Sequence, residues 1–170
     1  VYWNELIALE DWNMEMGKFT NKSKEALMLA RNLAIELKHQ ELNIFHLIKS
    51  LLSQDNGLIP SLLKRIEAPV HVVLAKVNDE LNTLPTVSGT ADVFQSREFS
   101  QMLNDAKKKA EQMQDDYVSV EHLFMASMDV NSKVQSIIES SGITKQKFMK
   151  GLQSVRGHQK VTSEDPENSF

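Results

Sequence analysis

The sequence predicts an all-α domain of eight helices, arranged as two pseudo-symmetric repeats of four helices each. The main observation is an internal duplication. Residues 117–128 repeat the pattern of residues 42–52 at an offset of 76 positions, which aligns His46 with His122. The segments that precede both copies keep one apolar helix face at the same offset. That face comprises Leu27, Ala30, Ala34 and Leu37 in the first copy and Leu103, Ala106, Ala110 and Met113 in the second.

The first two predicted helices each follow a residue that suits the N-cap position. Thr20 can cap a helix over residues 21–38, because its hydroxyl can accept a hydrogen bond from a backbone N–H of the first turn. Asn43 can cap a second helix over residues 44–53 in the same way. Gly57 follows this helix and suits a left-handed turn, because glycine has no Cβ to oppose a positive φ.

Two prolines mark the remaining helices of the first repeat. Pro60 lies near the first turn of a helix over residues 59–66, where its missing N–H costs little. Pro69 opens a fourth helix, whose apolar residues keep helical spacing through Leu81. Residues 83–95 concentrate Pro, Gly, Ser and Thr and therefore predict a linker between the repeats. Three apolar residues predict that part of this linker packs against the domain: Val87, Val93 and Phe94.

The second repeat follows the same plan. Ser96, Ser119 and Thr144 stand at predicted N-cap positions, and Ser119 is equivalent to Asn43. A unit of four short helices is small, so the two repeats are expected to need each other for a stable core. The helices predicted in this half cover residues 97–114, 120–128, 133–140 and 145–155.

Both ends of the chain differ from the duplicated region. Residues 1–15 have no counterpart in the repeats and precede Met16, so we interpret them as a leader or extension of uncertain origin. Residues 157–170 are polar and acidic without periodicity, which indicates a tail or the start of a linker. The predicted domain covers residues 16–156, with repeat one at about 19–82 and repeat two at about 96–156.

Composition restricts the class of function. The net charge of −4 argues against a protein that binds nucleic acid by neutralising phosphates. The chain has no cysteine, which excludes disulfides and thiolate chemistry. No apolar run approaches the length of a membrane-spanning helix, so we expect no membrane partner. The N-terminus lacks the pattern of a secretory signal, and the sequence therefore predicts a cytoplasmic protein.

The sequence lacks the motifs of common catalytic and metal sites. Its only Gly-Lys pair is Gly17-Lys18, and the position five residues before Gly17 is Trp12 where a phosphate-binding loop needs glycine. The five histidines show no metal-ligand spacing. His46 and His122 each precede a core leucine, which favours a structural role for both. We therefore predict no catalytic residue, no metal and no cofactor in this chain.

The two repeated helix starts carry a resemblance to a known family. They read Phe45-His46-Leu47 and Glu121-His122-Leu123, and this pattern resembles the N-terminal domain of the Clp family of AAA+ protein-remodelling machines. Residues 19–22 also resemble the start of that domain. Two stretches narrow the resemblance to the ClpB-type disaggregases. Residues 84–89 resemble their inter-repeat linker, and residues 155–163 resemble the segment before their first ATPase module. Residues 1–15 depart from the family, and Phe45 stands where many members carry Glu.

The resemblance implies that the chain is a monomeric fragment of a hexameric stress-response chaperone, which uses ATP and Mg²⁺ elsewhere in its sequence. The fragment would be the domain that engages unfolded or aggregated polypeptides. The family's substrate surface corresponds here to Thr20, Asp115 and Glu121. An apolar part of such a site could come from Phe94, Phe99, Leu103 or Tyr117. Each residue also has a structural interpretation: Thr20 as a cap, Glu121 as a partner of the helix dipole, Asp115 as ordinary loop, and the four apolar residues as core.

Two other functions stay open at this point. Related machines of the ClpA and ClpC type use the same fold to receive folded adaptor proteins for a protease-associated unfoldase. The linker and the exit segment favour the ClpB type. A standalone repeat protein without an ATPase is a third alternative, which the sequence downstream of Phe170 would decide.

Overall fold

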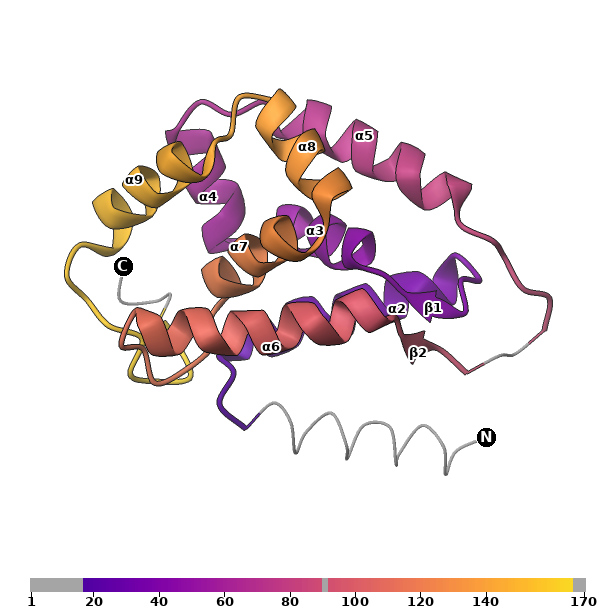
Figure 1. Cartoon of the computed structure of the whole chain (residues 1–170), viewed down its shortest axis with the longest axis horizontal. Coiled ribbons are helices and arrows are strands. Elements are labelled where there is room, and N and C mark those ends of the chain that lie inside the picture. The colour runs from indigo at the N-terminus through magenta and orange to yellow at the C-terminus, as the bar shows by residue number, and fades with distance from the viewer. Residues whose placement is uncertain (1–16, 90–91, 167–170) are drawn as a thin grey trace.

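The computed structural model describes residues 17–89 and 92–166, and the predicted leader at residues 1–15 lies outside them. The regular secondary structure of the described residues is helical apart from two very short strands, which confirms the all-α prediction, and the helices follow the predicted order (Figure 1). The helices of these residues are α2 (Asn21–Glu36), α3 (Ile44–Ser53), α4 (Leu58–Arg65), α5 (Val70–Thr83), α6 (Arg97–Gln112), α7 (Val120–Val130), α8 (Ser132–Ser140) and α9 (Lys145–Arg156).

Side-chain caps fix where the helices begin. The Thr20 hydroxyl accepts a hydrogen bond from the Ser23 N–H at 3.2 Å at the start of α2, and Ser96 accepts from the Phe99 N–H at 3.0 Å at the start of α6. Thr144 caps α9 in the same way. These predicted caps are confirmed.

The prediction for Gly57 is wrong. The residue with positive φ is Asn56, at 53°, whereas Gly57 has extended backbone and is itself the N-cap residue of α4. Asparagine tolerates the left-handed region better than most residues, which is why it can take the turn that glycine was expected to take.

Helices α3 and α7 occupy the centre of the molecule (Figure 1). They contact each other, α3 also packs on α2, α4 and α5, and α7 packs on α6 and α8. The second helix of each repeat is therefore enclosed by elements of both repeats. This explains why α3 and the first turns of α7 are hydrophobic on nearly all sides, as expected for buried helices.

One hydrophobic core runs through both repeats. Leu47 of α3 and Leu123 of α7 are fully buried, and the rings of Phe124 and Phe148 stack at 4.9 Å between α7 and α9. The predicted faces of α2 and α6 point into this core, with the last residue of each quartet, Leu37 and Met113, only half-buried because it caps its helix.

Two very short strand pairings join the repeats, and the sequence did not predict them. Strand β1 (Glu41–Leu42) pairs in parallel with β2 (Phe94–Gln95), and Phe19 forms an isolated parallel bridge with Val118. At the offset of 76, Phe19 is equivalent to Gln95 and Leu42 to Val118. Each repeat therefore pairs the residues before its first helix with the residues before the second helix of the other repeat.

The cap residues repeat this reciprocity in their backbone hydrogen bonds. The Thr20 N–H donates to the Val118 carbonyl at 2.9 Å, and the equivalent Ser96 N–H donates to the Leu42 carbonyl at 3.0 Å. Equivalent atoms of the two repeats thus make equivalent bonds to each other, as a pseudo-twofold arrangement requires. The strands lie where the repeats meet and do not interrupt the helical interior.

The segment after α9 packs on the domain, although its composition suggested a tail. Gly157 ends α9 with a φ of 59°, a conformation that suits glycine. Val161 is then fully buried, and its carbonyl accepts from the Asp116 N–H at 2.8 Å. The Glu164 carbonyl accepts from the Asn21 N–H at 2.7 Å. We call residues 157–166 the exit segment; it connects the end of repeat two with the start of α2.

Candidate functional site

Two buried histidines organise the junction between the repeats. His46 and His122 each occupy the third position of a helix, α3 or α7, and are fully buried. The Asn43 N–H donates to Nδ1 of His46 at 2.9 Å, and the Ser119 N–H donates to Nδ1 of His122 at 2.9 Å. Each imidazole therefore closes a capping box in the role usually taken by Glu or Gln. These contacts agree with the predicted structural role of both histidines.

The backbone donors also fix the tautomer of both rings. Because Nδ1 accepts a hydrogen bond, the proton of the neutral imidazole must be on Nε2. In repeat one, Nε2 of His46 donates to Nδ1 of His39 at 2.8 Å. In repeat two, Nε2 of His122 donates to a carboxylate oxygen of Asp115 at 2.8 Å. His39 and Asp115 are equivalent at the offset of 76.

Asp115 belongs to a buried charged cluster that repeat one lacks. Arg156 of α9 donates through Nη2 to Asp115 and through Nη1 to Oε1 of Glu121 at 3.4 Å. All three side chains are buried. At the offset of 76 the equivalents of Asp115 and Glu121 in repeat one are His39 and Phe45. The offset is 75 in the last two helices of the repeat, because a connecting loop is one residue shorter, so the equivalent of Arg156 is Leu81. We call Asp115, Glu121, His122 and Arg156 the ionic junction.

The ionic junction also holds the exit segment. The Val161 N–H donates to Oδ1 of Asp115 at 3.0 Å, and Nε of Arg156 donates to the Gln159 carbonyl at 3.0 Å. Oε2 of Glu121 has no hydrogen-bond partner among the residues that the structure describes. Arg156 was not among the predicted site residues. It follows the last apolar position of a helix, and its partners lie 35 and 41 residues earlier.

The two repeats shift the pKa values of their polar groups by different causes. Burial, reinforced by the neighbouring His39, lowers the pKa of His46 to about 4, and burial also lowers the pKa of His39. Burial alone would raise the pKa of Asp115. The hydrogen bonds from His122, Val161 and Arg156, together with the Arg156 charge, outweigh it and lower this pKa below its ordinary value. Repeat one thus keeps its histidine pair neutral, whereas repeat two keeps its aspartate ionised.

The predicted site residues fall into two groups. Thr20, Asp115 and Glu121 are all buried. The Thr20 N–H donates to the carbonyl of Val118, which lies between Asp115 and Glu121 in the sequence. Phe99 is fully buried in the core, and Leu103 is almost so. For these five residues the structure shows the packing and hydrogen-bonding roles directly. Whether they also affect substrate binding stays a prediction.

Phe94 and Tyr117 are the two predicted residues whose side chains reach the surface. Tyr117 is half-buried, with Nζ of Lys18 at 5.4 Å from its ring centroid. Phe94 is 52% exposed, more than any other large hydrophobic side chain of the described residues. Of the three linker residues expected to pack down, Val87 and Val93 are half-buried and Phe94 is not buried.

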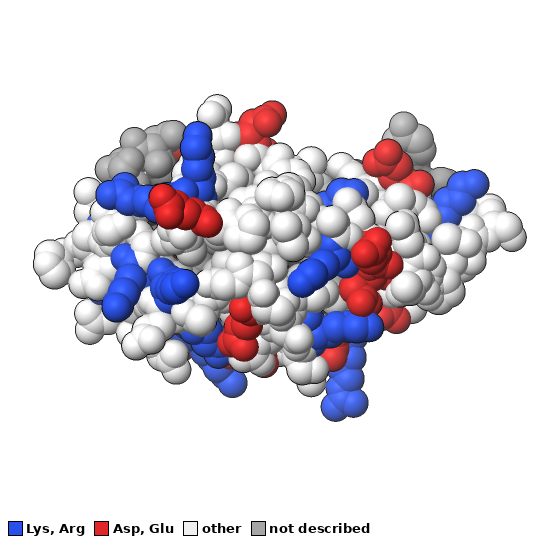
Figure 2. Space-filling view, turned by 90° about the horizontal axis from the view of Figure 1, so that it is seen from above, with Lys and Arg blue, Asp and Glu red and all other residues white. Residues whose placement is uncertain are grey.

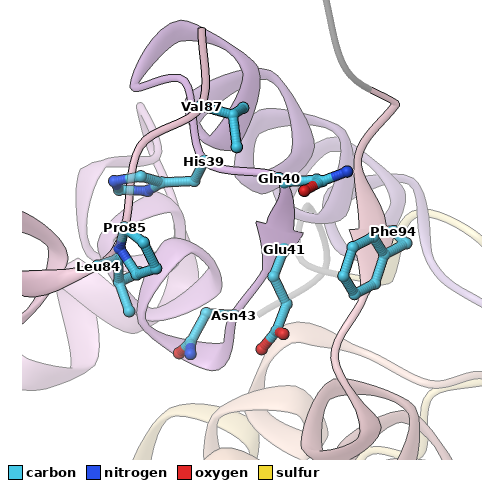
Figure 3. A pocket seen from close by; sticks show the side chains of 8 residues that line it. All are labelled: His39, Gln40, Glu41, Asn43, Leu84, Pro85, Val87 and Phe94. Atoms are coloured by element: carbon cyan, nitrogen blue, oxygen red, sulfur yellow. The ribbon is translucent and has the colours of Figure 1, made fainter.

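Phe94 stands at the edge of a groove beside the strands, which we call the linker groove (Figure 3). Its volume is about 240 Å³. Phe94 lies on one side, Leu84 and Pro85 lie on the other, and β1 runs between them. The groove is lined by His39, Gln40, Glu41, Asn43, Leu84, Pro85, Val87 and Phe94. Apart from Phe94, these residues were not predicted as site residues, although apolar side chains in an otherwise polar linker were a usable signal.

Within residues 17–89 and 92–166, no three His, Asp or Glu side chains are grouped so as to hold a metal ion. In the same residues, none of the helices has the length and hydrophobicity needed to cross a bilayer.

The fold and the junction define a duplicated all-α repeat domain. The family described as "Clp repeat (R) N-terminal domain" matches residues 18–141. The chain belongs to this family.

The chain is also similar to individual curated and solved proteins. It is 33% identical over 162 residues to the chaperone protein ClpB of Clostridium tetani, an alignment that covers 92% of this chain and 19% of that protein. The chain therefore spans about a fifth of the length of the curated relatives it matches. The N-terminal domain of Hsp104 from Candida albicans has the same fold, with a TM-score of 0.78, 21% identity, and coverage of 88% of this chain and 99% of that one. The N-terminal domain of the ClpV1 ATPase from Escherichia coli is similar with a TM-score of 0.72 and 17% identity, over 95% and 98% of the two chains.

Proposed function

We propose that this chain is the substrate-engaging N-terminal domain of a ClpB-type disaggregase, and that it binds exposed apolar segments of unfolded or aggregated polypeptides. The observation that carries the proposal is the exposure of Phe94 at the edge of the linker groove. The similarity to ClpB chaperones over 92% of the chain supports it. A large apolar side chain left in water beside a groove is typical of a binding surface.

The size of the groove sets the expected affinity. A volume of about 240 Å³ accommodates one or two side chains of a client. Burying one Leu or Phe side chain stabilises a complex by about 1.5–3 kcal/mol, and ordering the client opposes part of this gain. The proposed complex is therefore weak and short-lived, which suits a domain that must pass its client on.

The rest of the proposed machine lies outside this chain. ATP and Mg²⁺ would bind to the ATPase part of a hexameric parent in the cytoplasm, and residues 157–170 would lead toward that part. The exit segment would then connect the substrate domain to the motor through the ionic junction.

Thr20, Asp115 and Glu121 keep a place in this proposal, with a restricted role. Because their side chains are buried, a client could reach only the surface around them, including the ring of Tyr117. Their contribution would come from holding this surface in place.

A titration with a permanently unfolded, apolar polypeptide tests the proposal. We expect the amide NMR signals around Leu84, Val87 and Phe94 to shift, and Phe94→Ala to weaken binding several-fold. Leu29→Ala is the matched control, because Leu29 is 40% exposed and does not line the groove. Equal loss of binding in both variants, or shifts that avoid the groove, would contradict the proposal.

Adaptor docking remains the second candidate. The observation that favours it is the shared fold with the N-terminal domain of a caseinolytic-protease-associated chaperone, ClpD of Arabidopsis thaliana, with a TM-score of 0.60 and 14% identity. A pull-down from a cell extract separates the two functions. One folded partner at stoichiometric amounts would indicate an adaptor, whereas many misfolded proteins would indicate substrate capture.

A further inference from the structure

A second groove, which we call the α9 groove, is lined mainly by residues of α9 and the exit segment. In Figure 1, α9 lies at the other end of the molecule from β1 and β2, which flank the linker groove. The volume of the α9 groove is about 460 Å³, nearly twice that of the linker groove. It is lined by Met113, Gln146, Met149, Lys150, Leu152, Gln153, Arg156, Gly157, His158, Gln159 and Lys160.

The α9 groove combines an apolar floor with a basic rim. Leu152 is buried at its base, and Met149 is 41% exposed beside it. Lys150, His158 and Lys160 are exposed around it. None of its lining residues is acidic.

The surroundings of the groove extend the positive charge. Helices α4 and α9 pack against each other, and Lys64, Arg65 and Lys147 are exposed on them. Figure 2 shows Lys and Arg side chains at both ends of the molecule; at the end that carries α4 and α9 in Figure 1, a few Asp or Glu side chains lie among them. The linker groove differs, because Glu41 is its only charged lining residue other than histidine. The two grooves therefore favour ligands of different charge.

We propose that the α9 groove binds an acidic peptide segment of a partner protein, with an apolar side chain as its anchor. The anchor packs on Met149 and Leu152, where methionine adapts to side chains of different shape. Carboxylates on either side of the anchor pair with Lys150 and Lys160. Most of these contacts are exposed, so binding weakens as salt screens the charges.

The position of the groove gives the ligand access to the exit segment. Nζ of Lys160 donates to the Met113 carbonyl at 2.8 Å, and the Gln159 carbonyl accepts from Arg156. These bonds hold two lining residues of the groove against the end of α6 and the ionic junction. A peptide in the groove adds contacts to the same residues, and therefore increases the protection of their amides from hydrogen exchange.

Three synthetic peptides test the proposal. The first alternates Leu and Phe anchors with Glu, the second has Lys in place of Glu, and the third has Glu with no apolar residue. We expect the first to bind and to shift the amide signals of Met149, Lys150 and His158. The other two are expected to bind at least about tenfold more weakly, because the second peptide lacks the carboxylates and the third lacks the apolar anchor. Raising the salt concentration should weaken the first complex.

A pair of charge reversals distinguishes binding in the groove from a non-specific attraction to the positive charge at this end of the molecule. Lys150→Glu should weaken binding of the first peptide about fivefold or more. Lys64→Glu makes the same charge change on α4, outside the groove, and should have a much smaller effect. Thermal unfolding of both variants checks that they fold.

Four results would overturn the inference. They are equal binding of the acidic and basic peptides, equal binding of the peptide without anchors, equal loss in both charge reversals, and shifts confined to the residues around Phe94. The last result would assign the peptide to the linker groove. The α9 groove and the linker groove share no lining residue, so the two proposals can fail separately. Phe94→Ala should therefore leave binding of the acidic peptide unchanged.

Discussion

His39 and Asp115 occupy equivalent positions in the two repeats, and each accepts a hydrogen bond of 2.8 Å from Nε2 of a buried, helix-capping histidine. The duplicated backbone is the same, but the chemistry at this position differs. In repeat two the aspartate is balanced by Arg156, while in repeat one the equivalent of Arg156 is Leu81. A neutral histidine fits repeat one because a carboxylate there would have no buried cation to pair with.

The histidine pair of repeat one predicts a loss of stability in mild acid. The folded pKa of His46 is about 4, whereas the unfolded chain should have the ordinary value near 6.5. As the pH falls from about 6.5 to 4, the unfolded state binds a proton that the folded state does not. The free energy of unfolding should decrease by up to about 3 kcal/mol over this range through His46, with a further decrease from His39. The lowered pKa of Asp115 has the same sign but acts at lower pH.

Urea unfolding at pH 7 and pH 4.5 measures this effect. A His46→Asn variant should be less stable at pH 7 but should lose less stability between the two pH values. The explanation fails if the variant and the wild type show the same pH dependence, or if NMR places the pKa of His46 near 6.5.

The ionic junction predicts a large difference between two neighbouring aspartates. Asp115→Asn leaves the buried Arg156 guanidinium with less compensating charge, which should destabilise the domain by about 3–5 kcal/mol. Asp116→Asn changes an exposed side chain and should cost less than about 0.5 kcal/mol. Hydrogen exchange gives a second measurement, because the Val161 N–H donates to Asp115 and should exchange faster only in the first variant. If the Val161 amide exchanges at the same rate in Asp115→Asn and in the wild type, Asp115 does not hold the exit segment in place.

Most helices could be predicted because their signals are local. Leu27 and Leu103, with the alanines that follow them, each define a helix face within a dozen residues, and the caps Thr20 and Ser96 mark the starts of these two helices in the sequence itself. Because the two repeats are equivalent, each helix boundary could be predicted from two separate stretches of the sequence.

The junction could not be predicted because it depends on contacts between distant residues. The strands are two residues long, too short for any periodicity, and each pairs with the other repeat. The exit segment has the composition of a tail, yet Asp115 and Arg156 hold it in place. The candidate site was predicted in part. Phe94 is exposed beside a groove, but the linker residues opposite it were not identified, and Phe99 belongs to the core.

Phe94 and Phe99 should respond in opposite ways to truncation, although they are five positions apart. Phe99 is fully buried, so Phe99→Ala should destabilise the domain by about 3–5 kcal/mol. Phe94→Ala removes a side chain that is 52% exposed and should cost less than about 1 kcal/mol. Urea unfolding compares the two directly. A cost for Phe94→Ala as large as that for Phe99→Ala would mean that Phe94 is packed in the core and unavailable to a client.

Gly151 of α9 lies against Leu62 of α4 and Ile66, the residue that ends that helix, so a helix-favouring substitution at Gly151 should destabilise the domain. Alanine would normally stabilise a helix by about 1 kcal/mol relative to glycine. Here a Cβ would lie 2.8 Å from Cγ2 of Ile66, a branched methyl group that cannot easily move aside. Gly151→Ala should therefore reduce the free energy of unfolding by about 1–3 kcal/mol. Gln153→Ala, on the exposed side of the same helix, should change it by less than about 0.5 kcal/mol.

A double-mutant cycle decides whether the contact with Ile66 is the cause. Ile66→Ala removes the methyl group and, by itself, should destabilise the domain because Ile66 is half-buried against the core. In that background, Gly151→Ala should become neutral or stabilising, because only the helix propensity remains. The unfolding free energies of the four proteins give the coupling. If the changes in unfolding free energy of the two substitutions are additive, the contact between Gly151 and Ile66 does not determine how closely α9 packs on α4. Other residues would then stabilise the packing of the two repeats at this end.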